Sequence, residues 1–231
     1  LMPVLGIGSL VLSLLIGVGL TLFVIYLSVR KKVQDADYVI SVPDSGTPAA
    51  IGFAEELKLP FSEGLIKNRY VGRTFIMPRQ EGRNNAVRLK LNAVRAVVQG
   101  KNVLLVDDSI VRGTTMRKIV NLLKEAGASR VEVWVTCPPI KSPCFYGIDM
   151  STHAELIASN KSIEEIRETV GADALCYQTI DGLLDAIGFS NQETCLACLT
   201  GQYPTQLAQK IATEMHGKPQ NQNVRYWETE V

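Results

Sequence analysis

The chain has 231 residues, of which 46% are hydrophobic and 20% are charged, and these values describe a globular protein of one or two domains. Its formal net charge of +1 gives no electrostatic reason to expect a nucleic-acid partner or a strong attraction to a membrane surface. The charge is nevertheless distributed unevenly, because the first 29 residues carry none of it.

Residues 1–29 form an uncharged, mostly apolar run that ends at the basic sequence RKK. The run is longer than the roughly 20 residues that cross a bilayer as a helix, and it is too long for the apolar region of a signal peptide. It predicts a transmembrane helix whose basic flank keeps the following residues in the cytoplasm. The alternative, given equal weight, is that residues 1–30 are not native to the domain behind them, because a chain that begins at Leu1 suggests a fragment or a misjoined gene model.

After residue 30, short β-rich runs alternate with amphipathic helical stretches. One helix is predicted with Thr47 as its N-cap and Pro48 at its first position. In chain order we expect a strand at 37–43, a helix at 47–57, a strand at 102–108, a helix at 114–128 that ends at Gly127, and a strand at 130–138. This alternation predicts an α/β fold with a mostly parallel sheet and helices on both faces, and such folds bind ligands beyond the carboxyl ends of their strands.

The stretch VDDSIVRGTT, at 106–115, carries the strongest chemical signal in the chain. The neighbouring carboxylates Asp107 and Asp108 are costly to hold together unless a cation or several donors share their charge. The loop behind them leads into a helix N-terminus, which binds anions, and Gly113 lets the backbone approach one closely. We therefore expect a site for a sugar phosphate with a magnesium-bound pyrophosphate. The alternative is a capped turn with a solvated pair of aspartates.

Several stretches together resemble one enzyme family. VLLVDDSIVRGTT resembles the phosphoribosyl-pyrophosphate (PRPP) signature of type I phosphoribosyltransferases. From about residue 35 to about 206 the chain is similar to the glutamine PRPP amidotransferases (amidophosphoribosyltransferases) in VPDSGTPAAIGFAEE, GLIKNRYVGRTFIMPRQ, VRLKLNAVRAVVQGKNV, SPCFYGIDMSTHAELIAS and TCLACLTGQYPT. The resemblance implies a type I phosphoribosyltransferase domain over 31–206, between the apolar leader and a polar tail at 207–231. It also implies the first step of de novo purine (IMP) synthesis, in which ammonia displaces pyrophosphate from PRPP to give 5-phosphoribosylamine.

The resemblance assigns roles to individual residues. Asp107 and Asp108 would bind the ribose hydroxyls and, together with Ser45, a magnesium ion. Lys67, Arg69 and Arg73 would lie on a loop that closes over PRPP, where they would neutralise the departing pyrophosphate; a solvated surface loop is the alternative. No covalent intermediate is required. The 5-phosphate would be held by the loop residues Ser109, Ile110, Val111, Arg112, Gly113, Thr114 and Thr115.

The five cysteines are an odd number and include a C-x-x-C pair, which favours metal binding over disulfides. The resemblance to the iron–sulfur branch of the family implies that Cys144, Cys195 and Cys198 bind a [4Fe–4S] cluster. Cys137 and Cys176 are then expected to be small buried hydrophobic residues. The family's fourth cluster ligand lies upstream of VPDSG, where this chain has no cysteine, so the chain alone does not supply four cysteine ligands.

The resemblance also implies partners and leaves two other hypotheses open. The family has an N-terminal glutaminase domain that supplies ammonia from glutamine, and nothing in this sequence resembles it. The chain is then a fragment, or it uses free ammonia. Feedback inhibition by purine nucleotides, a homotetramer and a cytoplasmic catalytic domain, anchored to the membrane if residues 1–29 span it, are further expectations. A regulator that binds PRPP without turnover is one alternative, disfavoured by KNRYVGRTF, and a membrane-tethered scaffold is the other.

Overall fold

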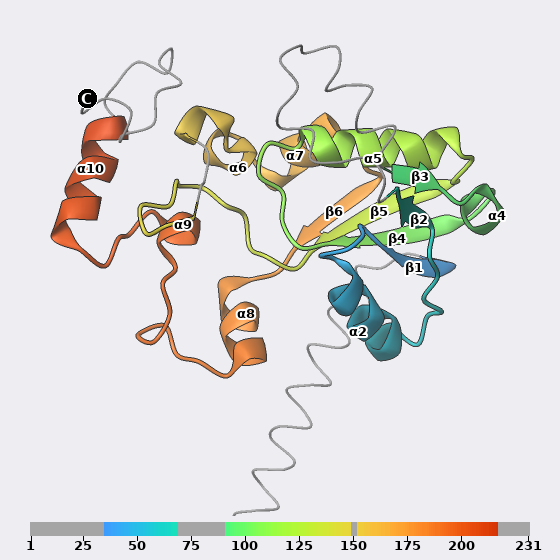
Figure 1. Cartoon of the computed structure of the whole chain (residues 1–231), viewed down its shortest axis with the longest axis horizontal. Helices are drawn as coiled ribbons and strands as arrows, with labels where there is room; N and C mark the ends of the chain where they lie inside the picture. Colours follow the sequence, from blue (N-terminus) through green and yellow to red (C-terminus); the bar gives the residue numbers. More distant parts are fainter. Residues whose placement is uncertain (1–34, 69–90, 149–151, 217–231) are drawn as a thin grey trace, which may run out of the picture.

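The computed structural model describes residues 35–68, 91–148 and 152–216. Its centre is a four-stranded sheet in the order β1-β4-β5-β6, and every neighbouring pair of strands is parallel (Figure 1). The strands are β1 (Tyr38–Ser41), β4 (Asn102–Asp107), β5 (Arg130–Val135) and β6 (Ala174–Tyr177). A separate antiparallel pair joins β2 (Leu65–Lys67) to β3 (Leu91–Ala93). The predicted α/β class with a mostly parallel sheet is confirmed.

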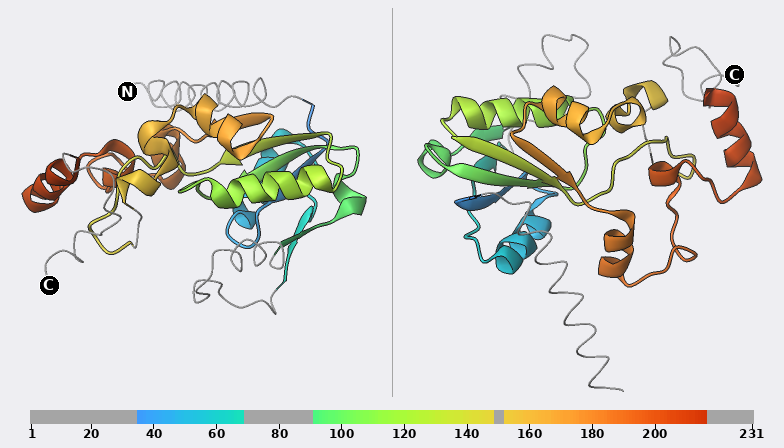
Figure 2. Two further views of the ribbon diagram at one scale, coloured as in Figure 1. Left: turned by 90° about the horizontal axis from the view of Figure 1, so that it is seen from above. Right: turned by 180° about the vertical axis from the view of Figure 1, so that it is seen from behind.

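Helices cover both faces of the sheet (Figures 1 and 2). The helical segments are α2 (Thr47–Leu57), α4 (Arg95–Val98), α5 (Thr114–Glu125), the 3-10 turn η2 (His153–Glu155), α6 (Ile157–Asn160), α7 (Ile163–Val170), α8 (Ile180–Ile187), α9 (Ala197–Thr200) and α10 (Gln206–His216). Side chains of β4 alternate between the faces, so that Val103 and Leu105 pack with α5 and α7 while Leu104 and Val106 pack with α2.

The predicted elements exist, and most are shorter than expected. The helix at 47–57 is confirmed with both bounds, but Gly46 is its N-cap, because Thr47 is already helical. The predicted strands 37–43, 102–108 and 130–138 are observed at 38–41, 102–107 and 130–135, and the helix 114–128 ends at Glu125. Two prolines, Pro138 and Pro139, follow the last of these strands and have no N–H for a strand ladder.

The ends of the chain bear on two further predictions. None of the helices in the described ranges is both long and apolar enough to cross a membrane, and the predicted membrane helix at 1–29 lies outside those ranges. Within the segment predicted as a polar tail from residue 207, residues 207–216 belong to helix α10. Ala208, Ile211 and Ala212 are buried on one face of α10, and this helical spacing was missed.

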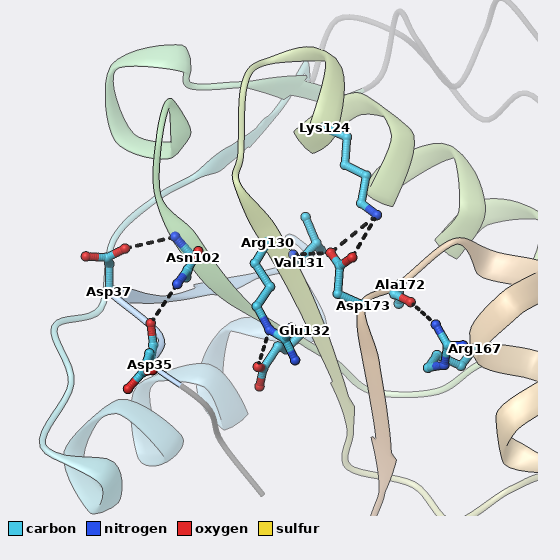
Figure 3. A network of polar contacts seen from close by, with 10 residues as sticks. All are labelled: Asp35, Asp37, Asn102, Lys124, Arg130, Val131, Glu132, Arg167, Ala172 and Asp173. Atoms are coloured by element: carbon cyan, nitrogen blue, oxygen red, sulfur yellow. Dashed lines mark hydrogen bonds and ion pairs between the residues drawn. The ribbon is translucent and has the colours of Figure 1, made fainter.

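Carboxylate side chains accept backbone hydrogen bonds at the amino ends of the strands (Figure 3). Asp37 accepts a hydrogen bond of 2.8 Å from the backbone N–H of Asn102, at the start of β4. Asp173 accepts one of 2.8 Å from the backbone N–H of Val131 and forms an ion pair with Lys124. The chain's own donors therefore bind the carboxylates of Asp37 and Asp173 at this edge. Ligands of parallel α/β sheets bind at the opposite, carboxyl edge.

Candidate active site

The loops that follow β1 and β4 are in direct backbone contact at the carboxyl edge of the sheet. The N–H of Val42 donates to the carbonyl of Val106 at 2.9 Å. A Cβ on Gly46 would lie 2.6 Å from the carbonyl oxygen of Val106 and 3.2 Å from the Cα of Asp107. Only glycine fits this approach, and it brings the loop that carries Ser45 against the backbone of Asp107.

Asp107 and Asp108 have different environments at the end of β4. Asp107 is 8% exposed, and its Oδ1 accepts the N–H of Asp108 at 2.9 Å. Burial raises the pKa of Asp107 to about 7, the N–H of Asp108 lowers it, and the negative charge of Asp108 raises it further. Asp108 itself is exposed. The end of β4 therefore carries one buried carboxylate, Asp107, directly followed by one solvent-exposed carboxylate, Asp108.

The two carboxylates suit a divalent cation. Within the described part of the chain, neither Asp107 nor Asp108 forms an ion pair with a lysine or arginine. A cation at this edge would offset the unfavourable burial of Asp107. Carboxylate and hydroxyl oxygens, including that of the exposed Ser45, are the hard ligands that magnesium takes together with water and substrate phosphates. The residues present therefore fit the magnesium ion that the resemblance implies.

The loop from Ser109 to Gly113 connects the carboxylates to α5. Gly113 has φ +74° and is the N-cap of this 12-residue helix, which has no acidic residue in its first turn. Ile110 is buried below the loop, while Thr114 and Thr115 are exposed at the start of the helix. Free backbone N–H groups, two hydroxyls and the positive end of the helix dipole make this N-terminus suitable for a phosphate.

Lys67 approaches the same edge from β2. Its Nζ lies 2.6 Å from Oδ2 of Asp44, which follows β1 in the loop VPDSG. The pairing of Lys67 with Leu91 in β2 and β3 also brings together the two ends of the intervening segment. Arg69 and Arg73, predicted for the closing loop, lie outside the described residues. Sequence reasoning missed Asp44, although its position beside Ser45 in VPDSG was a usable signal.

Sequence reasoning also missed a segment that contacts the loop from Ser109 to Gly113, here called the phosphate loop. Glu155 of η2 forms an ion pair with Arg112, with 2.8 Å between Oε1 and Nη2. The N–H of Ile157 donates to the carbonyl of Val111 at 2.9 Å. These residues are more than 40 positions from the loop along the chain, and no local pattern links them to it.

Cys137, Cys144, Cys195 and Cys198 lie near one another in a neighbouring part of the fold, whereas Cys176 packs with the side chains of α2. Burial raises the pKa of Cys198, and the nearby thiols of Cys144 and Cys195 raise it further. Burial, then the proximity of Cys198, raises the pKa of Cys137 to about 11. All five cysteines are free thiols, and Cys137 and Cys176 are half-buried rather than buried. Among the residues that the structure describes, no three Cys, His, Asp or Glu side chains are arranged to hold a metal, so the predicted ligation of a [4Fe–4S] cluster finds no support.

Comparison with known proteins identifies the family. The sequence model of the phosphoribosyl transferase domain matches residues 25–145, more than half of the chain. The chain belongs to the phosphoribosyl transferase domain family. The matched region of this phosphoribosyl transferase domain contains the carboxylate pair, the loop to Gly113 and Lys67.

Among the proteins of this family, the chain is similar to amidophosphoribosyltransferases. The amidophosphoribosyltransferase of Bacillus subtilis is 59% identical over 184 residues, which are 78% of this chain and 39% of that protein. The amidophosphoribosyltransferase of Methanocaldococcus jannaschii is 58% identical over 178 residues, 77% of this chain and 37% of that protein. The chain thus spans about two fifths of the length of the curated relatives it matches.

A solved structure agrees with these relatives. The glutamine phosphoribosylpyrophosphate amidotransferase of B. subtilis complexed with ADP and GMP superposes with a TM-score of 0.69 and 58% identity, over 77% of this chain and 40% of that chain. At this identity and TM-score, the likeness confirms both the predicted type I phosphoribosyltransferase fold and the resemblance to the amidotransferases.

Proposed function

We propose that this chain is the transferase part of an amidophosphoribosyltransferase, which makes 5-phosphoribosylamine and pyrophosphate from PRPP and ammonia at the start of purine (IMP) synthesis. The observation that carries the proposal is the buried–open pair Asp107 and Asp108, without a cationic partner in the described residues, directly before a loop that opens onto the N-terminus of α5. Relatives above 50% identity that carry this enzyme's name support it.

In the proposed reaction, the loop Ser109–Thr115 holds the 5-phosphate through backbone N–H groups and hydroxyls, while Asp107 and Asp108 accept hydrogen bonds from the ribose hydroxyls. Asp107, Asp108 and Ser45 are the proposed residues for magnesium, which when bound neutralises pyrophosphate charge. These contacts orient the sugar so that its C1 faces the attacking ammonia. Catalysis then comes from positioning and charge neutralisation.

The bond changes are those of a displacement at carbon. The lone pair of ammonia forms the new bond to C1, the bond from C1 to the pyrophosphate oxygen breaks with its electron pair, and the nitrogen loses a proton to solvent. Lys67 lies beside this edge and is held by Asp44. We propose that it exchanges this carboxylate for the pyrophosphate as negative charge develops there, with Arg69 and Arg73 in the same role.

The proposal extends to partners that the relatives suggest. The B. subtilis enzyme was solved with ADP and GMP, and we propose that purine nucleotides also bind and inhibit the protein to which this chain corresponds. Glutamine as the source of ammonia, a homotetramer and a cytoplasmic location belong to the same proposal. A [4Fe–4S] cluster held by Cys144, Cys195 and Cys198 stays a prediction. Iron and acid-labile sulfide measured on anaerobically purified chain would test it, and a stoichiometry near zero would reject it.

Pyrophosphate release by the 231-residue chain tests the main proposal. The chain receives PRPP, magnesium and an ammonium salt at mildly alkaline pH, and we expect release that depends on ammonia. The variant Asp107→Asn/Asp108→Asn should abolish it. Asp181→Asn/Asp185→Asn is the matched control, because it removes two exposed carboxylates from α8 and should leave the rate unchanged. PRPP binding without release by the wild type would instead favour the regulator that senses PRPP.

A further inference from the structure

The phosphate loop of α5 rests on a second segment that has no place in the proposed reaction. The N–H of Ile157 donates to the carbonyl of Val111 at 2.9 Å, and a Cβ on Gly113 would lie 2.6 Å from Cδ1 of Ile157. Ile157 therefore contacts the loop at two positions: it hydrogen-bonds the backbone of Val111 and packs closely against Gly113.

A charged contact adds to this support. Oε1 of Glu155 lies 2.8 Å from Nη2 of Arg112, and the two side chains are 33% and 50% exposed. Arg112 is thus directed to a fixed partner, although the exposed carboxylate of Asp108 lies only four residues earlier on the same loop. Without Glu155, the Arg112 guanidinium would be available to that carboxylate and would cost entropy to fix in any one position.

The segment that carries Glu155 is itself firmly placed. Leu156 is 1% exposed and packs with Ile140 and Leu199, in a cluster that Val111 of the loop also joins. The N–H of Glu155 donates to the carbonyl of Thr152 at 3.0 Å, which closes the turn η2. A rigid partner can hold a loop in place, whereas a mobile side chain cannot.

We propose that Glu155 is a positioning residue for PRPP binding: by holding Arg112 aside, it keeps the loop Ser109–Gly113 in the shape that receives the 5-phosphate. This inference rests on the proposed function, since it assumes that PRPP is the ligand. Preforming the loop removes an ordering cost that binding would otherwise bear, so the effect should be on affinity for PRPP.

Equilibrium binding of PRPP with magnesium, measured by titration calorimetry on the full chain, tests the inference. We expect Glu155→Gln to weaken binding about tenfold, the size typical of losing one ordering contact. Arg112→Gln should weaken it too, because it breaks the same ion pair that ties the loop to η2. The double variant should be no weaker than Arg112→Gln alone, because Glu155 acts through Arg112. Glu164→Gln is the matched control: it breaks an ion pair of 2.7 Å with Arg167 on α7 and should leave affinity unchanged.

A measurement without ligand separates positioning from other effects. Amide hydrogen exchange of the loop Ser109–Gly113 should be faster in Glu155→Gln than in wild type, while the amides of α2 exchange as before. If Glu155→Gln does not fold, Glu155→Asp replaces it. This variant keeps the charge on a shorter side chain and should weaken binding about threefold.

The outcomes separate the two proposals. A wild-type chain that does not bind PRPP overturns the proposed function and this inference with it. Wild-type binding with unchanged affinity and unchanged exchange in the Glu155 variants overturns the inference alone. Additive losses from Arg112→Gln and Glu155→Gln also reject it, because they would mean that Glu155 acts independently of Arg112.

Discussion

The two edges of the parallel sheet carry the same residue type in opposite electrostatic states. At the amino edge, the N–H of Asn102 and then Lys101 lower the pKa of Asp37. At the carboxyl edge, burial raises the pKa of Asp107 to about 7. At the first edge the chain's own donors bind Asp37 and Asp173, and the second keeps carboxylates and N–H groups for a ligand. Under the proposed function, the unfavourable burial of Asp107 lowers the stability of the free chain and prepares the carboxyl edge for magnesium and PRPP.

The largest loss of stability and of PRPP binding at the carboxyl edge is expected from a larger side chain at position 46. Gly46→Val would place side-chain atoms against the backbone of Val106 and Asp107, push the two loops apart and destabilise the chain by about 3 kcal/mol. PRPP binding should be lost. Chemical denaturation and calorimetry measure both quantities.

Gly52→Ala is the control for this substitution. Nothing lies within 4 Å of the position of its Cβ, and it sits inside α2. It should therefore stabilise the chain by roughly 0.5–1 kcal/mol, the difference in helix propensity between glycine and alanine. A Gly46→Val chain that keeps wild-type stability and affinity would contradict the close approach of the two loops.

An effect of similar size but opposite sign, a stabilisation, is expected from Asp107→Asn in the absence of magnesium. Because its pKa is raised in the folded state, the wild-type carboxyl binds more protons folded than unfolded between pH 3.8 and about 7. Its contribution to stability is therefore lost as the pH rises through this window. Asp107→Asn should remove that dependence and raise the free energy of unfolding by about 2–4 kcal/mol at pH 8. Denaturation curves at pH 5 and pH 8 measure the difference.

Magnesium gives the matching control for the same carboxyl. Millimolar magnesium should raise the unfolding temperature of the wild type at pH 8, because a ligand bound only to the folded state stabilises it. It should have little effect on Asp107→Asn. Equal stability of the two proteins at pH 8 without the ion would show that Asp107 is not an unfavourably buried charge.

The smallest effect is expected from Asp37→Asn at the amino edge. This substitution should destabilise the chain, whereas Asp107→Asn should stabilise it. The lowered pKa means that the ionised Asp37 stabilises the folded chain above pH 3.8, and that this contribution is lost as the pH falls through the folded pKa. The side chain is 37% exposed, so the loss at pH 7 should stay below about 1 kcal/mol. The same denaturation series measures it, and a stabilising substitution would break the contrast between the edges.

Much of the proposed site could be predicted because it lies in one continuous stretch. The site follows the chain without interruption, from strand β4 through the carboxylates and Gly113 to the start of α5. Each local sequence signal therefore concerns residues that are immediate neighbours. The helix Thr47–Leu57 was predicted with both bounds for the same reason, although the cap was misplaced by one residue. Strand ends were less predictable, because they depend on where the neighbouring strand stops.

The amino-acid sequence by itself determined the α/β class, the carboxylate pair and the helix N-terminus behind it, since strand, turn and helix signals act between residues a few positions apart. Only the tertiary structure decided that Asp44 binds Lys67, that Glu155 holds Arg112, and that α10 packs its apolar face inward. These contacts join segments that are distant along the chain. The first two exist because the loops after β1 and β4 leave the parallel sheet at one edge, where packing selects which side chains meet. The third exists because α10 packs with Phe145, Ala197 and Tyr203.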